Sequence, residues 1–253
     1  MPRSPEKYIY HNPPNLKHLL FDFDGTLADT SYGIHKAFVS ACQLTGLTAP
    51  DYPSFRSTIG PPIIGLSQRF FPNIDHHLRR EFVETFRIQY DTNYYRDCRW
   101  YKGVENSLKF FHQKRVLLGV VTNKPTQPTK DLLESAGFNE YFTIVVGIDA
   151  IGKDSLFRSK SDALTWTLQQ LEIDHRGDSL YVGDTISDEE ACSLVGLPFI
   201  AAGYGFYEWA PEDVARLNRK NTDQIFDPWI TQPLSTLKQL SDTLLIEQNI
   251  EDT

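Results

Sequence analysis

Residues 16–30 read Leu-Lys-His-Leu-Leu-Phe-Asp-Phe-Asp-Gly-Thr-Leu-Ala-Asp-Thr, an apolar run that meets two aspartates and a glycine. Such a run is typical of a short buried strand, and Gly25 lets the chain turn sharply where the strand ends. Asp22 and Asp24 lie two residues apart on an extended chain, so they point to one face, where their charges repel. A bound divalent cation compensates this repulsion, and carboxylate oxygens favour magnesium over zinc. The stretch predicts a magnesium site at a strand end, although an Asp-x-Asp pair taken alone also suits a solvated turn.

Four more apolar runs predict further strands, at residues 116–121, 142–146, 179–182 and 198–202. Helical patterns separate them, at 104–113, 129–136, 162–171 and 188–195. This alternation is typical of parallel β-α-β units covered by helices on both faces. We therefore expect an α/β fold with a Rossmann-like parallel sheet, to which 224–226 adds an edge strand and 234–246 a closing helix.

The stretch from about residue 32 to 99 has a different, helical pattern. Leu78, Phe82, Phe86 and Tyr90 recur at steps of four, and an earlier segment has a similar apolar stripe. We expect a small α-helical domain at 31–99, inserted between a first core part, 1–30, and a second, 100–253. The alternative is that these helices simply cover the sheet.

The composition excludes several classes of protein. The 253 residues include 33 acidic and 25 basic ones, a formal charge of -8, which argues against an extended nucleic-acid-binding face. The three cysteines, Cys42, Cys98 and Cys192, are too far apart to suggest a disulfide framework or a zinc site. Residues 1–15 do not read as a secretory signal, and no apolar run approaches the length of a membrane span. We expect a cytoplasmic protein without nucleic-acid or membrane partners, and the oligomeric state stays open.

A second pair of acids follows the predicted strand at 179–182. Asp184 and Asp188 come just after it, and acids at the ends of neighbouring parallel strands converge at one sheet edge. Asp184 would then complete a magnesium site with Asp22. Asp188, in the first turn of the following helix, either binds the metal, supports the site, or caps the helix.

Groups suited to a phosphate dianion follow two other segments. Thr122 and Asn123 come directly after the predicted strand at 116–121, and Lys160 opens a predicted helix. A hydroxyl, a backbone amide and an ammonium together suit a phosphate.

In this arrangement the sequence resembles the haloacid dehalogenase superfamily, in particular its phosphatases with a small helical cap, and is most similar to phosphoglycolate-phosphatase-like members. The family's first motif, Asp-x-Asp-Gly-Thr, corresponds to residues 22–26, and its second, a Thr or Ser, to Thr122. Its third motif, a Lys, corresponds to Lys160, and its fourth, Gly-Asp-x-x-x-Asp, to residues 183–188. The family often has Lys-Pro at the third motif, whereas Ser follows Lys160 here, so Lys153 and Arg158 are rival candidates.

The resemblance implies a magnesium-dependent phosphatase that acts on a small phosphorylated metabolite. Asp22 would attack phosphorus and form an aspartyl phosphate, while Asp24 would protonate the leaving alcohol and then activate water. The Asp22 and Asp184 side chains and the Asp24 main-chain carbonyl would hold Mg²⁺, and Thr122, with Asn123 and Lys160, would bind the phosphate. The segment 60–65, with Gly60 and the nearby Arg56 and Arg69, is the candidate specificity segment, unless it is a plain connecting loop.

The same motifs occur in enzymes with other activities. Asp24 counts against the dehalogenase and phosphonate-cleaving branches of the superfamily, whereas a phosphomutase of the β-phosphoglucomutase type keeps both aspartates and stays open. Residues 147–154 nearly fit a nucleotide-binding P-loop, but Asp154 stands where a hydroxyl is needed. A non-catalytic phosphate- or nucleotide-binding protein is the remaining alternative.

Overall fold

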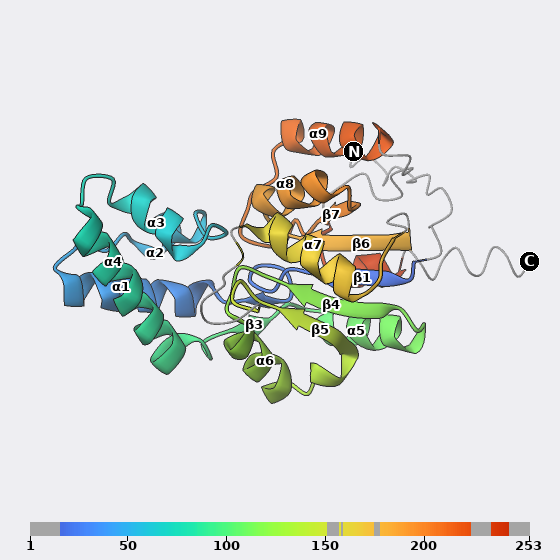
Figure 1. Ribbon diagram of the computed structural model, residues 1–253, viewed down its shortest axis with the longest axis horizontal. Helices are drawn as coiled ribbons and strands as arrows, with labels where there is room; N and C mark the ends of the chain where they lie inside the picture. Colours follow the sequence, from blue (N-terminus) through green and yellow to red (C-terminus); the bar gives the residue numbers. More distant parts are fainter. Residues whose placement is uncertain (1–15, 151–156, 158, 175–177, 224–233, 243–253) are drawn as a thin grey trace, which may run out of the picture.

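A computed structural model describes residues 16–150, 157, 159–174, 178–223 and 234–242 (Figure 1). Its centre is a parallel five-stranded sheet in the order β5-β4-β1-β6-β7. The strands are β1 (His18–Phe21), β4 (Leu117–Val121), β5 (Phe142–Val146), β6 (Ser179–Gly183) and β7 (Phe199–Ala201). The predicted parallel α/β fold is therefore confirmed, with each strand within a few residues of its apolar run.

The register of the three central strands aligns their carboxyl ends. Phe21, the last residue of β1, pairs with Val120 on one side and Val182 on the other. The residues that follow each strand therefore meet at one edge of the sheet. This edge is where open α/β sheets hold their ligands.

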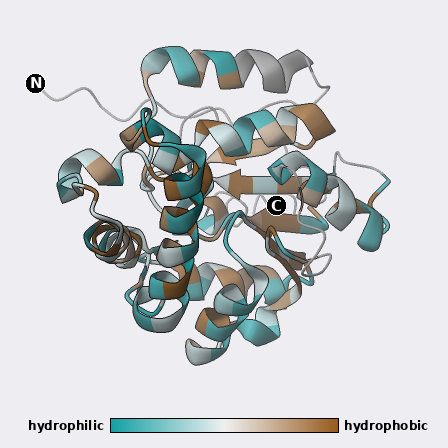
Figure 2. Ribbon diagram, turned by 60° about the vertical axis from the view of Figure 1, so that its left-hand side comes forward, coloured by the Kyte–Doolittle hydropathy of each residue, from teal (hydrophilic) through white to brown (hydrophobic). Residues whose placement is uncertain are grey.

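Helices cover both faces of the sheet and divide the core in two. Leu19 and Phe21 of β1 belong to one apolar cluster, together with α5 (Val104–Gln113) and α6 (Thr126–Ser135). Leu20 belongs to the other, with α7 (Lys160–Gln170), α8 (Ile186–Val195) and part of α9 (Pro211–Asp223). Alternate residues of a strand point to opposite faces, so a sheet packed on both sides needs unbroken apolar runs. Figure 2 shows the result as strands that are mostly brown.

Four helices follow the first strand and form a separate group beside the sheet (Figure 1). These inserted helices are α1 (Ser31–Thr45), α2 (Tyr52–Arg56), α3 (Ile63–Phe70) and α4 (His76–Gln89), and a π-helical turn, η1 (Tyr90–Tyr94), continues α4. A short antiparallel pair, β2 (Ala28–Asp29) and β3 (Arg99–Trp100), joins the two connecting chains. The ring of Phe38 lies 4.8–6.5 Å, between centroids, from five other phenylalanine rings of this group: Phe55, Phe70, Phe71, Phe82 and Phe86.

Local sequence explains where these helices begin and end. The side chains of Asp51 and Asp75 accept backbone N–H bonds of 2.8 Å at the starts of α2 and α4. Gly46 ends α1 in the left-handed conformation, with φ of 72°. Gly65, expected in a connecting segment, instead lies inside α3, and the loop that precedes this helix spans 57–62.

The remaining elements bear on two sequence expectations. A 3₁₀ turn, η2 (Asn139–Tyr141), leads into β5. The expected edge strand at 224–226 lies outside the described residues, and of the expected helix at 234–246 the structure describes a helical segment at 237–242. Among the described residues, no helix has both the length and the apolar character needed to span a membrane.

Candidate active site

Three buried aspartates meet at the carboxyl edge of the sheet. Asp22 follows β1, whereas Asp184 and Asp188 follow β6, and each contributes a carboxylate oxygen within 4.8 Å of the other two. The backbone N–H of Asp22 donates to the Val182 carbonyl at 2.9 Å, which ties the two strand ends together. The structure thus brings Asp22 of the first motif together with Asp184 and Asp188 of the fourth, the convergence that the sequence predicts.

Asp184 is held by a pocket that requires glycine on two sides. Its carboxylate accepts the Phe206 backbone N–H at 2.7 Å and the Thr26 hydroxyl at 3.4 Å. A Cβ atom on Gly25 would lie 2.1 Å from Asp184 Oδ2, and one on Gly205 would lie 2.5 Å from the same atom. Because such distances are far below van der Waals contact, both positions need glycine.

Asp188 supports the site through two other residues. Its Oδ2 atom accepts the Thr185 backbone N–H at 2.9 Å and the Thr185 hydroxyl at 2.6 Å, which caps helix α8. Its Oδ1 atom makes an ion pair with Lys160, whose Nζ lies 2.9 Å from Asp22 Oδ2. Since both carboxylate oxygens are engaged, Asp188 is placed to orient Lys160. The rival cations, Lys153 and Arg158, lie outside the described residues.

The electrostatics of this cluster fit a divalent cation. Burial raises the pKa of Asp22 to about 6, although Lys160 opposes the shift, and Asp188 adds to it. Burial also raises the pKa of Asp184 well above its usual value, and the charges of Asp188 and Asp22 raise it further. A cation beside Asp22 and Asp184 would relieve this repulsion, and their hard oxygen donors suit Mg²⁺.

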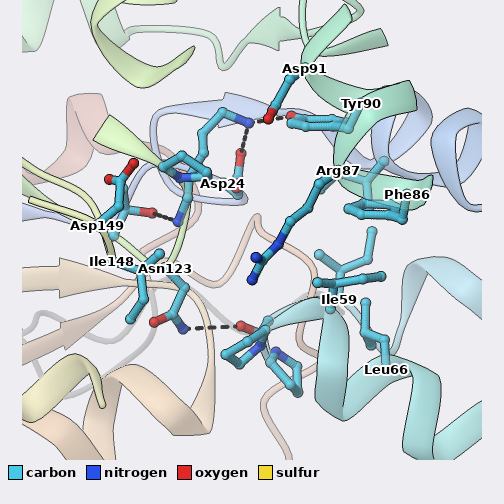
Figure 3. Close-up of a pocket in the computed structure, with 18 of the residues that line it drawn as sticks. Asp24, Ile59, Leu66, Phe86, Arg87, Tyr90, Asp91, Asn123, Ile148 and Asp149 are labelled. Atoms are coloured by element: carbon cyan, nitrogen blue, oxygen red, sulfur yellow. Dashed lines mark hydrogen bonds and ion pairs between the residues drawn. The ribbon is translucent and has the colours of Figure 1, made fainter. Parts of the chain in front are cut away.

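Asp24 lies beside the cluster in a second polar network. Its Oδ1 atom accepts the Thr30 hydroxyl at 2.7 Å and lies 3.4 Å from Lys124 Nζ. Lys124 also donates to the hydroxyl of Tyr90, which begins the π-helical turn (Figure 3). Burial by itself would lower the pKa of Lys124, but Asp24 and Tyr90 outweigh it and leave the pKa above its ordinary value. This chain of contacts links the inserted helices to the first motif.

A cavity of about 430 Å³ separates the strand ends from the inserted helices (Figure 3). The sheet side presents Asp22, Asp24 and Thr122. Asn123, also on this side, donates from Nδ2 to the Gly60 carbonyl at 3.4 Å. This volume is ordinary for a small-molecule site.

The three positions of the candidate specificity segment lie in different places. Gly60 lines the cavity, and a Cβ there would lie 2.9 Å from the Thr185 methyl group. Arg56 is not among the lining residues, because its guanidinium turns to the Gly205 carbonyl at 3.4 Å and to the Phe206 ring. Arg69 is exposed on α3 and does not line the cavity.

Sequence reasoning does not select three residues that line this cavity: Tyr90, Lys124 and Arg87. Tyr90 belongs to an apolar stripe, which predicts a position in the hydrophobic core. Lys124 directly follows Asn123, so its position after a predicted strand could have identified it as a site residue. Arg87 has no signal of its own, because a single arginine beside the apolar stripe of an amphipathic helix is ordinary.

Comparison with known proteins identifies the family. The model of the haloacid dehalogenase-like hydrolase family matches residues 19–202, well over half of the chain. A phosphoglycolate phosphatase from Photobacterium profundum is 30% identical over 221 residues, which cover 84% of this chain and 92% of the relative. A protein of the same name from Aquifex aeolicus is 29% identical over 231 residues, 90% of this chain and 98% of the relative.

Solved structures of phosphatases and haloacid dehalogenase-like hydrolases share this fold. A predicted phosphatase from Clostridium acetobutylicum superposes with a TM-score of 0.74 at 24% identity and covers 91% of this chain and 99% of its own. A haloacid dehalogenase-like hydrolase from Streptococcus pneumoniae superposes with a TM-score of 0.70 at 23% identity, over 80% of this chain and 91% of its own. At these identities the likeness concerns the fold, and the family assignment depends on the sequence match. The chain belongs to the haloacid dehalogenase-like hydrolase family, as the resemblance of its four motifs predicts.

Proposed function

We propose that the protein is a magnesium-dependent phosphatase that hydrolyses a small phosphorylated metabolite through an aspartyl phosphate. The observation that carries this proposal is the convergence of Asp22, Asp184 and Lys160 at one sheet edge, where Asp22 lines a cavity of about 430 Å³. The curated relatives named phosphoglycolate phosphatase make phosphoglycolate the first substrate to test.

Asp22 is the nucleophile in this proposal. Its Oδ1 atom accepts the backbone N–H of Phe23 at 2.8 Å and its Oδ2 atom faces Lys160, so its carboxylate is held in one orientation. Attack on phosphorus forms a bond to a carboxylate oxygen and expels the alcohol. Lys160, whose Nζ is 2.9 Å from Asp22 Oδ2, and Thr122, which lines the cavity, would hold the phosphoryl oxygens. Mg²⁺, held by Asp22, Asp184 and the Asp24 carbonyl, would offset the repulsion between the two anions.

Asp24 is the general acid and base. It is less buried than Asp22, and Thr30 and Lys124 both contact its Oδ1 atom. It would donate a proton to the departing alkoxide and then take one from the water that hydrolyses the aspartyl phosphate. A residue with two such roles needs a fixed position, which these two contacts provide.

The inserted helices act as a cap in this proposal, so that the chain divides into a core at 1–30 and 100–253 and a cap at 31–99. The contacts of Gly60 with Asn123 and of Tyr90 with Lys124 join the two parts across the cavity. A cap seated in this way excludes water during attack and places its own side chains against the leaving group.

The test is the release of phosphate by the purified chain from phosphoglycolate, sugar phosphates, nucleoside monophosphates, pyrophosphate and 4-nitrophenyl phosphate, with Mg²⁺ and with EDTA. We expect Mg²⁺-dependent release, and a loss of at least about a thousandfold in Asp22→Asn, since an amide cannot replace the nucleophile. Asp174→Asn, an exposed aspartate after α7, is the control and should keep full activity. Binding of these phosphates without any turnover would contradict the proposal.

A further inference from the structure

Arg87 projects from helix α4 into the cavity, opposite the strand ends (Figure 3). Within the described part of the chain, no carboxylate oxygen lies within 4.0 Å of its guanidinium, and no hydrogen bond satisfies it. A guanidinium presents five donors in a planar fork that matches carboxylate and phosphate oxygens. Arg87 is therefore a cation turned toward the space that substrate would occupy.

The other charged groups beside Arg87 are already engaged. Lys124 contacts Asp24 and Tyr90. Asp149 Oδ1 accepts both the backbone N–H and the hydroxyl of Thr126, at 2.7 and 2.8 Å. Asp91, one turn after Arg87, interacts electrostatically with Lys124 and, more weakly, with Arg87, but no Asp91 oxygen lies within 4.0 Å of the guanidinium. Arg87 is thus available to an anion brought by the substrate.

The wall around Arg87 is apolar. It is formed by side chains from α1, the α2–α3 loop, α3 and α4: Ile34, Ile59, Ile63, Leu66 and Phe86. Arg87 is itself exposed, so these apolar side chains exclude water from one side of its guanidinium and strengthen an ion pair there only in part. They also accept the carbon skeleton of a leaving group.

We propose that Arg87 is a specificity residue that binds a second anionic group on the leaving alcohol of the substrate. This inference rests on the proposed phosphatase function and narrows its substrate class to phosphomonoesters whose alcohol also carries a carboxylate or a second phosphate. In the proposed function the transferring phosphate would lie on the opposite side of the cavity, where Asp22 and Thr122 line it and Lys160 contacts Asp22. Arg87 therefore acts on substrate binding and orientation, separately from the chemical step.

Three substrates that share one ring test this inference: 4-nitrophenyl phosphate, 4-carboxyphenyl phosphate and 1,4-phenylene bisphosphate. The nitro and carboxylate groups have nearly the same shape and differ in charge. For Arg87→Ala we expect kcat/KM for at least one of the two substrates with an anionic leaving group to fall at least about tenfold relative to 4-nitrophenyl phosphate, mainly through KM. Arg87→Lys, which keeps the charge without the fork, should lie between wild type and Arg87→Ala.

Arg80→Ala is the matched control, because Arg80 lies two turns earlier on α4, is exposed and does not line the cavity. It should leave the substrate ratios unchanged. Equal losses for all three substrates in Arg87→Ala would place Arg87 on the transferring phosphate and overturn the inference, and so would unchanged ratios.

A binding measurement separates this inference from the proposed function. Calorimetric dissociation constants for the same three compounds, measured in an Asp22→Asn background with Mg²⁺, should show the same change of ratio when Arg87 is replaced. If the wild-type chain releases no phosphate but the binding ratio shifts, the phosphatase proposal fails and the anion site stands. If the chain releases phosphate but replacing Arg87 changes neither the kcat/KM ratios nor the binding ratios, the proposal of an anion site is wrong and the phosphatase proposal is unaffected.

Discussion

Lys160 provides the positive charge that offsets the repulsion among three buried carboxylates. Its ammonium contacts Asp22 and Asp188, and it is itself buried. Removing one partner of a buried ion pair leaves uncompensated charge, which typically costs about 3–5 kcal/mol. In EDTA, Lys160→Met should therefore lower the free energy of unfolding by about this amount, measured by urea denaturation, and Lys160→Arg should lose much less.

The same replacement should also affect turnover. Phosphate release by Lys160→Met in Mg²⁺ should fall at least about a hundredfold, because Lys160 is the cation held against the nucleophile. Lys130, exposed on α6, provides the control variant Lys130→Met, which should keep both stability and activity. A stable and active Lys160→Met protein would show that another cation, from outside the described residues, does this work.

At the level of elements, the π-helical turn η1 brings the inserted helices into contact with the first motif. Tyr90→Phe removes the hydroxyl that Lys124 contacts and leaves the ring, which stacks on Phe86. Lys124 then holds Asp24 less firmly, so we expect kcat for phosphoglycolate to fall about tenfold, the scale of one lost hydrogen bond to a charged group. The loss should be smaller for 4-nitrophenyl phosphate, whose leaving group departs without needing a proton.

This dependence on the leaving group distinguishes a positioning role from a purely structural one. Tyr94→Phe, four residues later in the same turn, is the control and should change neither substrate. If Tyr90→Phe slowed both substrates equally, the hydroxyl would be serving the stability of the cap rather than the position of Asp24.

At the level of the whole molecule, the sequence predicts the parts of the site that lie on the sheet. Asp22, Thr122 and Asp184 follow strands whose ends are aligned by the parallel register, so a pattern of short apolar runs suffices to bring them together. Lys160 is harder to predict because it starts a helix, and the family resemblance selects it.

The cap side of the site is not predictable in this way. Whether Arg56, Arg69 or Arg87 faces the cavity depends on the rotation and tilt of the inserted helices against the sheet. A positive charge near a loop suggests Arg56, which instead binds the Gly205 carbonyl, while Arg87 faces the cavity from the last turn of helix α4. Apolar periodicity gives the buried side of a helix but does not say which polar residue at its border reaches a neighbouring domain.

Stability should depend on pH and Mg²⁺ together. The pKa of Asp22 is about 6 in the folded chain against an ordinary 3.8, so the folded state binds more protons than the unfolded state between these values. The free energy of unfolding of the metal-free protein should therefore fall as pH rises through this window. Mg²⁺ binds the deprotonated carboxylates, so it should restore stability above about pH 6 and do little below it.

Thermal unfolding in EDTA and in saturating Mg²⁺ measures this coupling. At pH 7.5 we expect Mg²⁺ to raise Tm by about 5–10 °C, the effect of a ligand at roughly 100 times its Kd on a domain of this size. At pH 5 the increase should be below about 2 °C, because protonation of Asp22 competes with the metal. Asp22→Asn mimics the protonated form, so it should be more stable than wild type in EDTA at pH 7.5 and respond weakly to Mg²⁺ at both pH values. If Mg²⁺ raised the Tm of the wild-type chain equally at pH 5 and pH 7.5, the metal would not depend on a carboxylate whose pKa is raised by burial, and the prediction would be wrong.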